Sequence, residues 1–257
     1  MLVHIFSAIL LVLTSFICQK QAIAQSSIIA TIDNSLKSIV YIKSESAVIG
    51  KDSDVLVKDE KTGKILLMKR AKGAKFDRTG SGVIIDATGI IVTNAHIVQN
   101  AGRITVTLND QTKYEAEVLW IASGDDLAFL RIKPKKPLTP LPLSHPDTIK
   151  LNATVYTIGS SEILDGTITQ GKITGIGKSN KKKKQKGEYA DLIQIGFNLY
   201  KGDSGAPLLD NEGKLLGLMI ATQRKQSRKS FAIPAYKIKA YLQQFSRKFL
   251  TQETDSP

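Results

Sequence analysis

The most informative stretch of the sequence is residues 201–209, Lys201-Gly202-Asp203-Ser204-Gly205-Ala206-Pro207-Leu208-Leu209. A serine hydroxyl attacks a carbonyl efficiently only when a base removes its proton, and the oxyanion that forms needs hydrogen-bond donors close by. Glycines on both sides of Ser204 permit a tight backbone turn that aims the N–H groups of Gly202 and Ser204 at one point. This stretch therefore predicts a nucleophile at Ser204 and an oxyanion hole formed by Gly202 and Ser204.

The general base has to come from another part of the chain. Beyond the first 24 residues the sequence holds two histidines, His96 and His145. His96 follows a strong strand pattern, whereas His145 stands before a proline in a proline-rich stretch, where a fixed catalytic geometry is hard to arrange. We therefore predict His96 as the base, since an imidazole can accept and return a proton near neutral pH.

The third catalytic group should be a carboxylate at the start of a strand. Asp125 and Asp126 both precede the apolar run Leu-Ala-Phe-Leu. Such a carboxylate would hold the imidazole in the correct tautomer and stabilise the imidazolium. Adjacent residues on an extended segment point in opposite directions, so only one of the two can face the histidine, and spacing alone does not choose between them.

Short strand patterns recur along the chain. Two apolar runs, residues 83–85 and 90–92, flank Asp86-Ala87-Thr88-Gly89, which predicts a hairpin turn. Residues 133–146 contain five prolines, and we expect this stretch to be an extended, unpaired connection between two β domains. A chain of 257 residues that is 42% hydrophobic suits a single all-β unit of two barrels.

The two ends and one insertion have their own patterns. Apolar residues at helical spacing predict a short helix over residues 28–39, and Pro234 is expected to start a last helix that buries Ile238, Leu242, Phe245 and Phe249. The charged segment from Ser44 to Thr79 contains two apolar runs around Gly63, which predicts an inserted hairpin. A regulatory or oligomerisation loop and an idle surface insertion both remain open for it.

The first 24 residues are predicted to be a signal peptide. They are apolar and nearly uncharged, and they end in Ala22-Ile23-Ala24, so that Gln25 would be the mature start. The alternatives are an uncleaved anchor and a lipoprotein modified at Cys18. Cys18 is the only cysteine, so the mature chain could form no disulfide and must be stabilised by packing alone, which suits a bacterial envelope protein. The predicted signal peptide indicates an exported protein, in the bacterial periplasm or secreted.

The net charge of +13 is concentrated in two basic runs, from Lys181 to Lys186 and from Arg224 to Lys229. Such runs are either solvated loops or a surface for an anionic partner, and we expect nucleic acid not to be that partner. No Cys/His ligand cluster and no phosphate-binding loop is recognisable, so we predict neither a metal nor an organic cofactor. The sequence does not indicate an oligomeric state.

Five segments follow the order found in trypsin-like serine proteases, and their layout resembles the HtrA/Deg branch. The resemblance implies a chymotrypsin-like fold of two six-stranded antiparallel β-barrels, with residues 25–143 and 144–250 as the barrels and 251–257 as a tail. In this family the acid directly precedes Leu-Ala, which implies Asp126 beside His96 and Ser204. The segments are residues 80–85 (GSGVII), 93–98 (TNAHIV), 126–128 (DLA), 202–208 (GDSGAPL) and 231–234 (FAIP).

The resemblance also implies how a substrate binds. A polypeptide would pair as an added strand with Ile220, Ala221 and Thr222. The specificity pocket would lie near Asn198 and Leu199, and because no carboxylate stands six residues before the serine, a small or medium uncharged side chain is expected there.

Some features depart from the branch. Ala206 replaces the second glycine after the serine, and residues 159–161 (GSS) and 194–197 (QIGF) differ from the usual segments. The chain ends soon after the last predicted helix, so we expect it to lack a C-terminal PDZ domain.

Two other functions compete with a peptidase. A protease-fold binding module that uses its basic surface would need no working triad. An α/β esterase would carry its acid between serine and histidine, whereas the order here is His, Asp, Ser.

Overall fold

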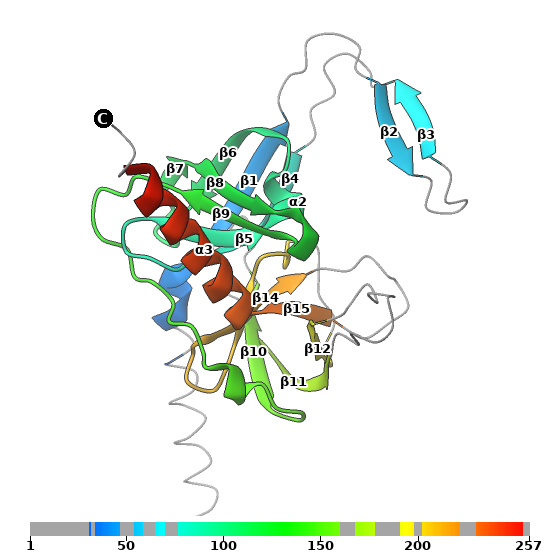
Figure 1. Ribbon diagram of the computed structural model, residues 1–257. Coiled ribbons are helices and arrows are strands. Elements are labelled where there is room, and N and C mark those ends of the chain that lie inside the picture. Colours follow the sequence, from blue (N-terminus) through cyan, green and yellow to red (C-terminus); the bar gives the residue numbers. More distant parts are fainter. Residues whose placement is uncertain are drawn as a thin grey trace, which may run out of the picture.

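The computed structural model describes residues 31, 34–46, 54–58, 65–69, 77–159, 168–177, 191–197, 202–220 and 230–253. Within these ranges the protein is mostly β, with a seven-stranded sheet, a closed six-stranded barrel and a separate two-stranded hairpin (Figure 1). All strand pairs between named strands are antiparallel. The predicted all-β class with a chymotrypsin-like arrangement is confirmed.

The first sheet has the order β7-β6-β1-β4-β5-β9-β8. We expected six strands here in a closed barrel, and this count is wrong. The sequence from Tyr114 to Trp120 has the pattern of one strand, but this pattern breaks at Ala116, whose N–H donates to the Ile104 carbonyl at 2.9 Å. Its two halves therefore lie on opposite edges of a curled sheet. The strands are β1 (Ile39–Ser46), β4 (Asp77–Ile84), β5 (Ile90–Asn94), β6 (Ala101–Thr107), β7 (Lys113–Glu115), β8 (Glu117–Ala122) and β9 (Leu127–Arg131).

The second unit closes completely, in the order β10-β11-β12-β15-β14-β13. Strand β14 is buried along nearly its whole length, as its short apolar run predicts. The strands are β10 (Thr154–Ile158), β11 (Ile168–Ile176), β12 (Ile193–Ile195), β13 (Pro207–Leu209), β14 (Leu215–Ile220) and β15 (Ser230–Pro234).

A buried apolar cluster joins the two units in addition to the cluster inside each. Because side chains from both sheets contribute to it, the interface between the sheets is itself core. Its buried members include Ile39, Val83, Val92, Leu127 and Phe129 from the sheet and Tyr156, Ile158, Leu209, Leu215, Leu218 and Ile233 from the barrel.

Both predicted hairpins are present. In the β4–β5 turn the Asp86 carboxylate accepts from the Thr88 N–H at 2.7 Å, and Gly89 has φ +103°, a conformation that favours glycine. Strand β2 (Asp54–Lys58) pairs with β3 (Ile65–Lys69), and within the described ranges these two strands pair only with each other. Gly63, the predicted turn residue, lies outside the described residues.

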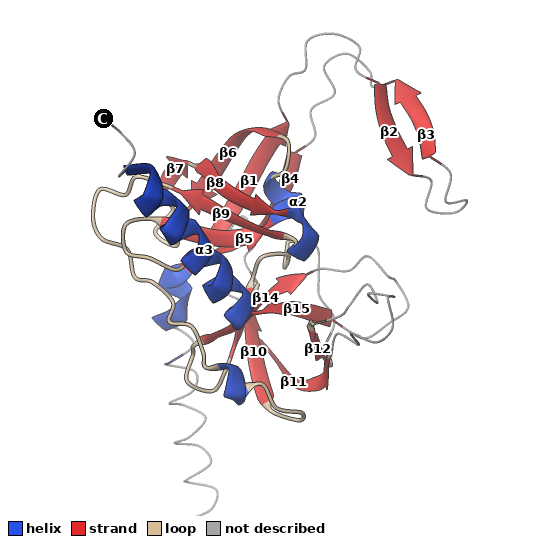
Figure 2. Cartoon of the chain, viewed as in Figure 1, coloured by secondary structure: helices blue, strands red, loops and turns tan. Residues whose placement is uncertain are grey.

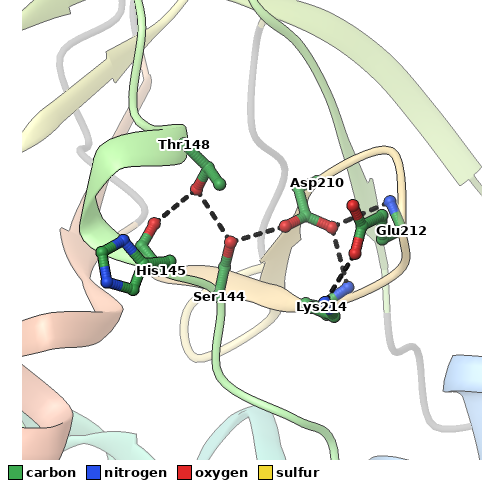
Figure 3. Close-up of polar contacts among 6 residues, drawn as sticks. All are labelled: Ser144, His145, Thr148, Asp210, Glu212 and Lys214. Atoms are coloured by element: carbon green, nitrogen blue, oxygen red, sulfur yellow. Dashed lines mark hydrogen bonds and ion pairs between the residues drawn. The ribbon is translucent and has the colours of Figure 1, made fainter.

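The proline-rich connection is extended, but the expectation that it is unpaired is wrong. The residues between its prolines still carry N–H groups, and these donate to both units: Leu141 to the Ile84 carbonyl at 2.8 Å and Ser144 to the Leu215 carbonyl at 2.8 Å. The Ser144 hydroxyl also donates to Asp210 at 2.5 Å, next to the short helix η3 (Pro146–Thr148), as Figure 3 shows. The connection therefore ties the sheet to the barrel.

Helices lie at both ends of the described chain. Residues 31 and 34–35 are helical before the 3-10 turn η1 (Leu36–Ser38), and α3 (Ala235–Glu253), in which Ile238 is fully buried, is the last described element. Leu242 packs against the shared core, as predicted, whereas the side chains of Phe245 and Phe249 lie outside the description. Figure 2 shows α3 running across the boundary between the sheet and the barrel. None of the helices in the described ranges has the length and apolar character needed to cross a bilayer.

The predictions for residues 1–24 and for both basic runs concern parts of the chain outside the described ranges.

Candidate active site

Ser204 lies in a tight turn just before β13. The Ala206 N–H donates to the Asp203 carbonyl at 3.0 Å, and the Gly205 N–H donates to the Met219 carbonyl at 2.9 Å. Gly202 and Gly205 have φ +107° and +81°, so both use the left-handed freedom that glycine alone has at low cost. The turn holds Ser204 with only 7% of its surface exposed.

Contacts with β4 dock this turn onto the first sheet. The Ser81 N–H donates to the Ser204 carbonyl at 2.8 Å, and the Ser81 hydroxyl donates to the Gly202 carbonyl at 3.0 Å. A hydroxyl from β5 supports Ser81 in turn, since Thr93 Oγ1 donates to the Ser81 carbonyl at 2.7 Å. Ser204 therefore lies in the part of the sequence that forms the barrel, but its turn is hydrogen-bonded to the first sheet.

His96 and Asp126 form a bidentate pair within the first unit. His96 lies on α2 (Ala95–Val98), a single turn directly after β5. Its Nδ1 is 2.8 Å from Asp126 Oδ2, and its backbone N–H donates to Oδ1 at 2.9 Å. A carboxylate can only accept, so Nδ1 carries the proton and Nε2 is left as the nitrogen that can take one. The histidine side chain is 47% exposed, so a substrate can reach it.

Two further donors fix the backbone of Asp126. The Ala95 N–H and the Asn94 side-chain amide donate to its carbonyl at 3.0 and 3.2 Å. Asp126 itself has φ +53°, in the left-handed region that non-glycine residues rarely adopt. The hydrogen bonds around it hold the carboxylate against His96.

Gly80 is the point where α2 and the Ser204 turn converge. A Cβ added to Gly80 would stand 2.4 Å from Ile97 Cδ1 and 3.0 Å from the Ser204 carbonyl oxygen. The absence of a side chain at this residue therefore lets the helix that bears His96 and the turn that bears Ser204 approach each other.

The other candidate groups lie elsewhere. Asp125, which the sequence left as an alternative acid, bonds Lys237 and Tyr241 of α3 at 2.7 and 2.6 Å. His145 caps η3 and pairs with Asp147 at 3.2 Å on an exposed surface.

The predicted substrate-binding residues are only partly described. Ile220 is the last residue of β14 and lies opposite Phe231 of β15. Asn198, Leu199, Ala221 and Thr222 lie outside the described residues.

Sequence reasoning assigned no role to Ser81 or Asn94, or to Lys237 and Tyr241. The small residues in the Gly80-Ser81-Gly82 stretch of β4 are the one local signal of a close approach.

No group of three or more His, Cys, Asp or Glu side chains could hold a metal ion in the part of the chain that the structure describes. The groups described above are the Ser204 hydroxyl, the His96 imidazole and the Asp126 carboxylate.

Comparison with known proteins finds relatives that are named as proteases. "Protease Do-like 1, chloroplastic" of Arabidopsis thaliana is 34% identical over 173 residues, which is 66% of this chain and 39% of that protein. "Serine protease HTRA2, mitochondrial" of Bos taurus is 34% identical over 66% of this chain and 36% of its own length. "Periplasmic serine endoprotease DegP" of Salmonella typhimurium is 34% identical over 64% and 35%. The chain thus spans well under half the length of these curated relatives.

The family described as "Trypsin-like peptidase domain" matches residues 80–218. That span is more than half of the chain, and it includes both Gly80 and the Ser204 turn. The chain therefore belongs to the trypsin-like peptidase family.

Proposed function

We propose that this protein is a serine endopeptidase in which Ser204 is the nucleophile, His96 the general base and Asp126 the acid that orients it. The observation that carries the proposal is the His96 Nδ1–Asp126 Oδ2 contact of 2.8 Å, on the sheet to which Ser81 docks the Ser204 turn. The names of the relatives, all proteases, support the same activity.

The reaction proceeds in two steps. Ser204 attacks the peptide carbonyl while His96 Nε2 takes its proton, and His96 then protonates the leaving amine. Water releases the acyl group from the serine by the reverse proton path. The N–H groups of Gly202 and Ser204 stabilise the oxyanion, and each such donor contributes about 3–4 kcal/mol to the transition state.

The substrate is a polypeptide bound as an added strand along Ile220, Ala221 and Thr222. A small or medium uncharged side chain enters a pocket near Asn198 and Leu199. Main-chain pairing gives affinity with little demand on sequence, which fits an enzyme of broad specificity.

We place the enzyme outside the cytoplasm, in the periplasm or secreted, on the basis of the apolar first 24 residues. The relatives are named as periplasmic, chloroplastic and mitochondrial proteins, so their compartments do not decide the compartment of this protein.

Labelling with an organophosphonate probe tests the activity. We expect the parent protein to be labelled and to cleave an unfolded protein substrate, and Ser204→Ala and His96→Gln to do neither. His145→Gln is the matched control and should keep both properties. If neither the parent nor Ser204→Ala reacts, the protein is a binding module on a protease fold.

A further inference from the structure

The turn that carries Asp126 is held between two helices. On one side, α2 supplies the His96 N–H and the Ala95 N–H to Asp126. On the other side, α3 holds Asp125, the residue directly before Asp126 in the 3-10 turn η2 (Ser123–Asp125). The carboxylate that orients the imidazole is therefore one peptide unit away from a contact with the C-terminal helix.

The contact with α3 engages both oxygens of Asp125. Lys237 Nζ donates to Oδ1 at 2.7 Å, and the Tyr241 hydroxyl donates to Oδ2 at 2.6 Å. Lys237 and Tyr241 are four residues apart, so they share one helix face. The Lys237 and Asp125 side chains are 17% and 31% exposed, which limits competition from water and strengthens these charge-assisted bonds.

The same contact affects Tyr241. Its hydrogen bond to the Asp125 carboxylate, with burial and the negative charge of Asp125 adding to the effect, raises the pKa of Tyr241 to about 12. The hydroxyl therefore keeps its proton, and stays a donor to Asp125, throughout the neutral range.

The backbone between the two aspartates needs such support. A non-glycine residue at φ +53° costs of the order of 1–3 kcal/mol and persists only when its surroundings fix it. The bonds from α2 fix the carbonyl and the carboxylate of Asp126, but its own N–H makes only a long bond of 3.3 Å to the Ser123 carbonyl. The backbone on the N-terminal side of Asp126 therefore depends on the bonds from α3 to Asp125.

We propose that Lys237 and Tyr241 are positioning residues, which hold Asp125 so that the Asp126 carboxylate is aimed at His96 Nδ1. This inference rests on the proposed function, in which Asp126 orients the base. In this role neither residue needs to contact the substrate. The C-terminal helix thereby becomes a structural part of the triad, although it lies far from it in the sequence.

Steady-state kinetics on the full chain test this. We expect Tyr241→Phe and Lys237→Met each to lower kcat about tenfold with KM unchanged, since small misplacements of a catalytic group reduce the rate and not ground-state binding. Tyr236→Phe and Lys239→Met make the same chemical changes at exposed sites of the same helix and should leave kcat unchanged.

Proton NMR gives a second measurement, which would not change if Lys237 and Tyr241 only stabilised the fold. A proton shared between an imidazole and a carboxylate resonates far downfield, so the His96 Nδ1 proton reports the contact with Asp126. We expect its signal to weaken or shift in Tyr241→Phe and Lys237→Met. Ile238→Val, which loosens the buried face of α3 without touching Asp125, controls for lost stability and should leave the signal in place.

The outcomes separate this proposal from the proposed function. Unchanged kcat and an unchanged signal in both variants would overturn the positioning role, as would a kcat loss that Ile238→Val reproduces. The parent could cleave no substrate and still show a downfield signal that is lost in Tyr241→Phe. In that case the positioning role stands and the proposed peptidase activity is wrong.

Discussion

At the scale of single residues, two adjacent carboxylates serve different partners. Asp126 faces His96 of α2, and Asp125 faces Lys237 and Tyr241 of α3. The sequence predicts that neighbours point apart, but it does not say which partner lies on which side. Only the family resemblance chose Asp126, because the donors that hold Asp125 are more than a hundred residues away and leave no local pattern.

Asp126→Asn should reduce kcat about 10⁴-fold with little change in KM. The amide keeps the shape of the carboxylate but can present its NH₂ group to Nδ1, which favours the tautomer with the proton on Nε2. Steady-state kinetics on a peptide substrate measure the effect. Asp147→Asn breaks the similar but exposed His145 pair and should be neutral, so an equal loss in both variants would contradict the assignment.

Gly205→Ala should destabilise the protein by about 3 kcal/mol or more. A Cβ here would stand 2.0 Å from the Ser81 carbonyl oxygen, and φ is already +81°. The turn would have to move, so probe labelling of Ser204 should also slow. Gly124→Ala is the control in urea denaturation, because a Cβ there meets nothing within 4 Å, and comparable losses in the two variants would refute this explanation.

At the scale of elements, Asp210 anchors the connection between the sheet and the barrel. In Figure 3, Ser144 lies between Asp210 and Thr148, and Asp210 Oδ1 also accepts the N–H groups of Glu212 and Lys214 at 2.9 and 3.0 Å. The β13–β14 turn and the connection are thereby joined through one carboxylate.

Ser144→Ala should lower the free energy of unfolding by about 1–2 kcal/mol, because Asp210 Oδ2 loses its hydroxyl donor in a poorly solvated place. The shift of the urea midpoint measures this. Asp147→Asn changes an exposed neighbour in η3 and should cost little. A neutral Ser144→Ala would mean that water replaces the hydroxyl.

The β2–β3 hairpin allows a test of its own. Glu45 lies opposite Asp77 in the β1–β4 pair, so a two-residue Asn-Gly turn can replace residues 47–75. We expect the shortened protein to keep its melting temperature and its labelling at Ser204, since within the described ranges the hairpin pairs only with itself. Loss of labelling, or a change of oligomeric state in native mass spectrometry, would give the insertion a regulatory or assembly role.

The elements that the sequence predicted well are those with local causes. The turn at Asp86 and Gly89 follows from side-chain and backbone preferences inside four residues. The proline-rich connection was predicted less well. A proline indicates that its own N–H is missing, but it does not indicate which acceptors bind the N–H groups of the residues between the prolines. The division of one strand pattern at Ala116 depends on the curvature of the whole sheet, which no short window contains.

At the scale of the whole molecule, the contact between Tyr241 of α3 and Asp125 contributes to the stability of the fold. The pKa of Tyr241 is raised above its ordinary value of 10.0 to about 12, so the folded state favours its neutral form. The stability that this contributes is fully present below pH 10 and is lost as the pH rises toward 12.

The difference in unfolding free energy between the parent and Tyr241→Phe should therefore be constant below pH 10 and shrink between pH 10 and 12. Urea denaturation at a series of pH values measures it. Tyr114→Phe on β7 is the control, and curves for the parent and Tyr241→Phe that stay parallel up to pH 12 would contradict the prediction.

The separation of His96 and Ser204 between two sheets has a consequence for biogenesis. Ribosomes make the N-terminal part first, so the imidazole emerges well before the hydroxyl, and a chain with only its first half folded holds no nucleophile. Because side chains of both halves build the shared core, that core can form only after the second half has been made. On the proposed mechanism, a nascent chain could therefore cleave no protein around it until both halves have folded.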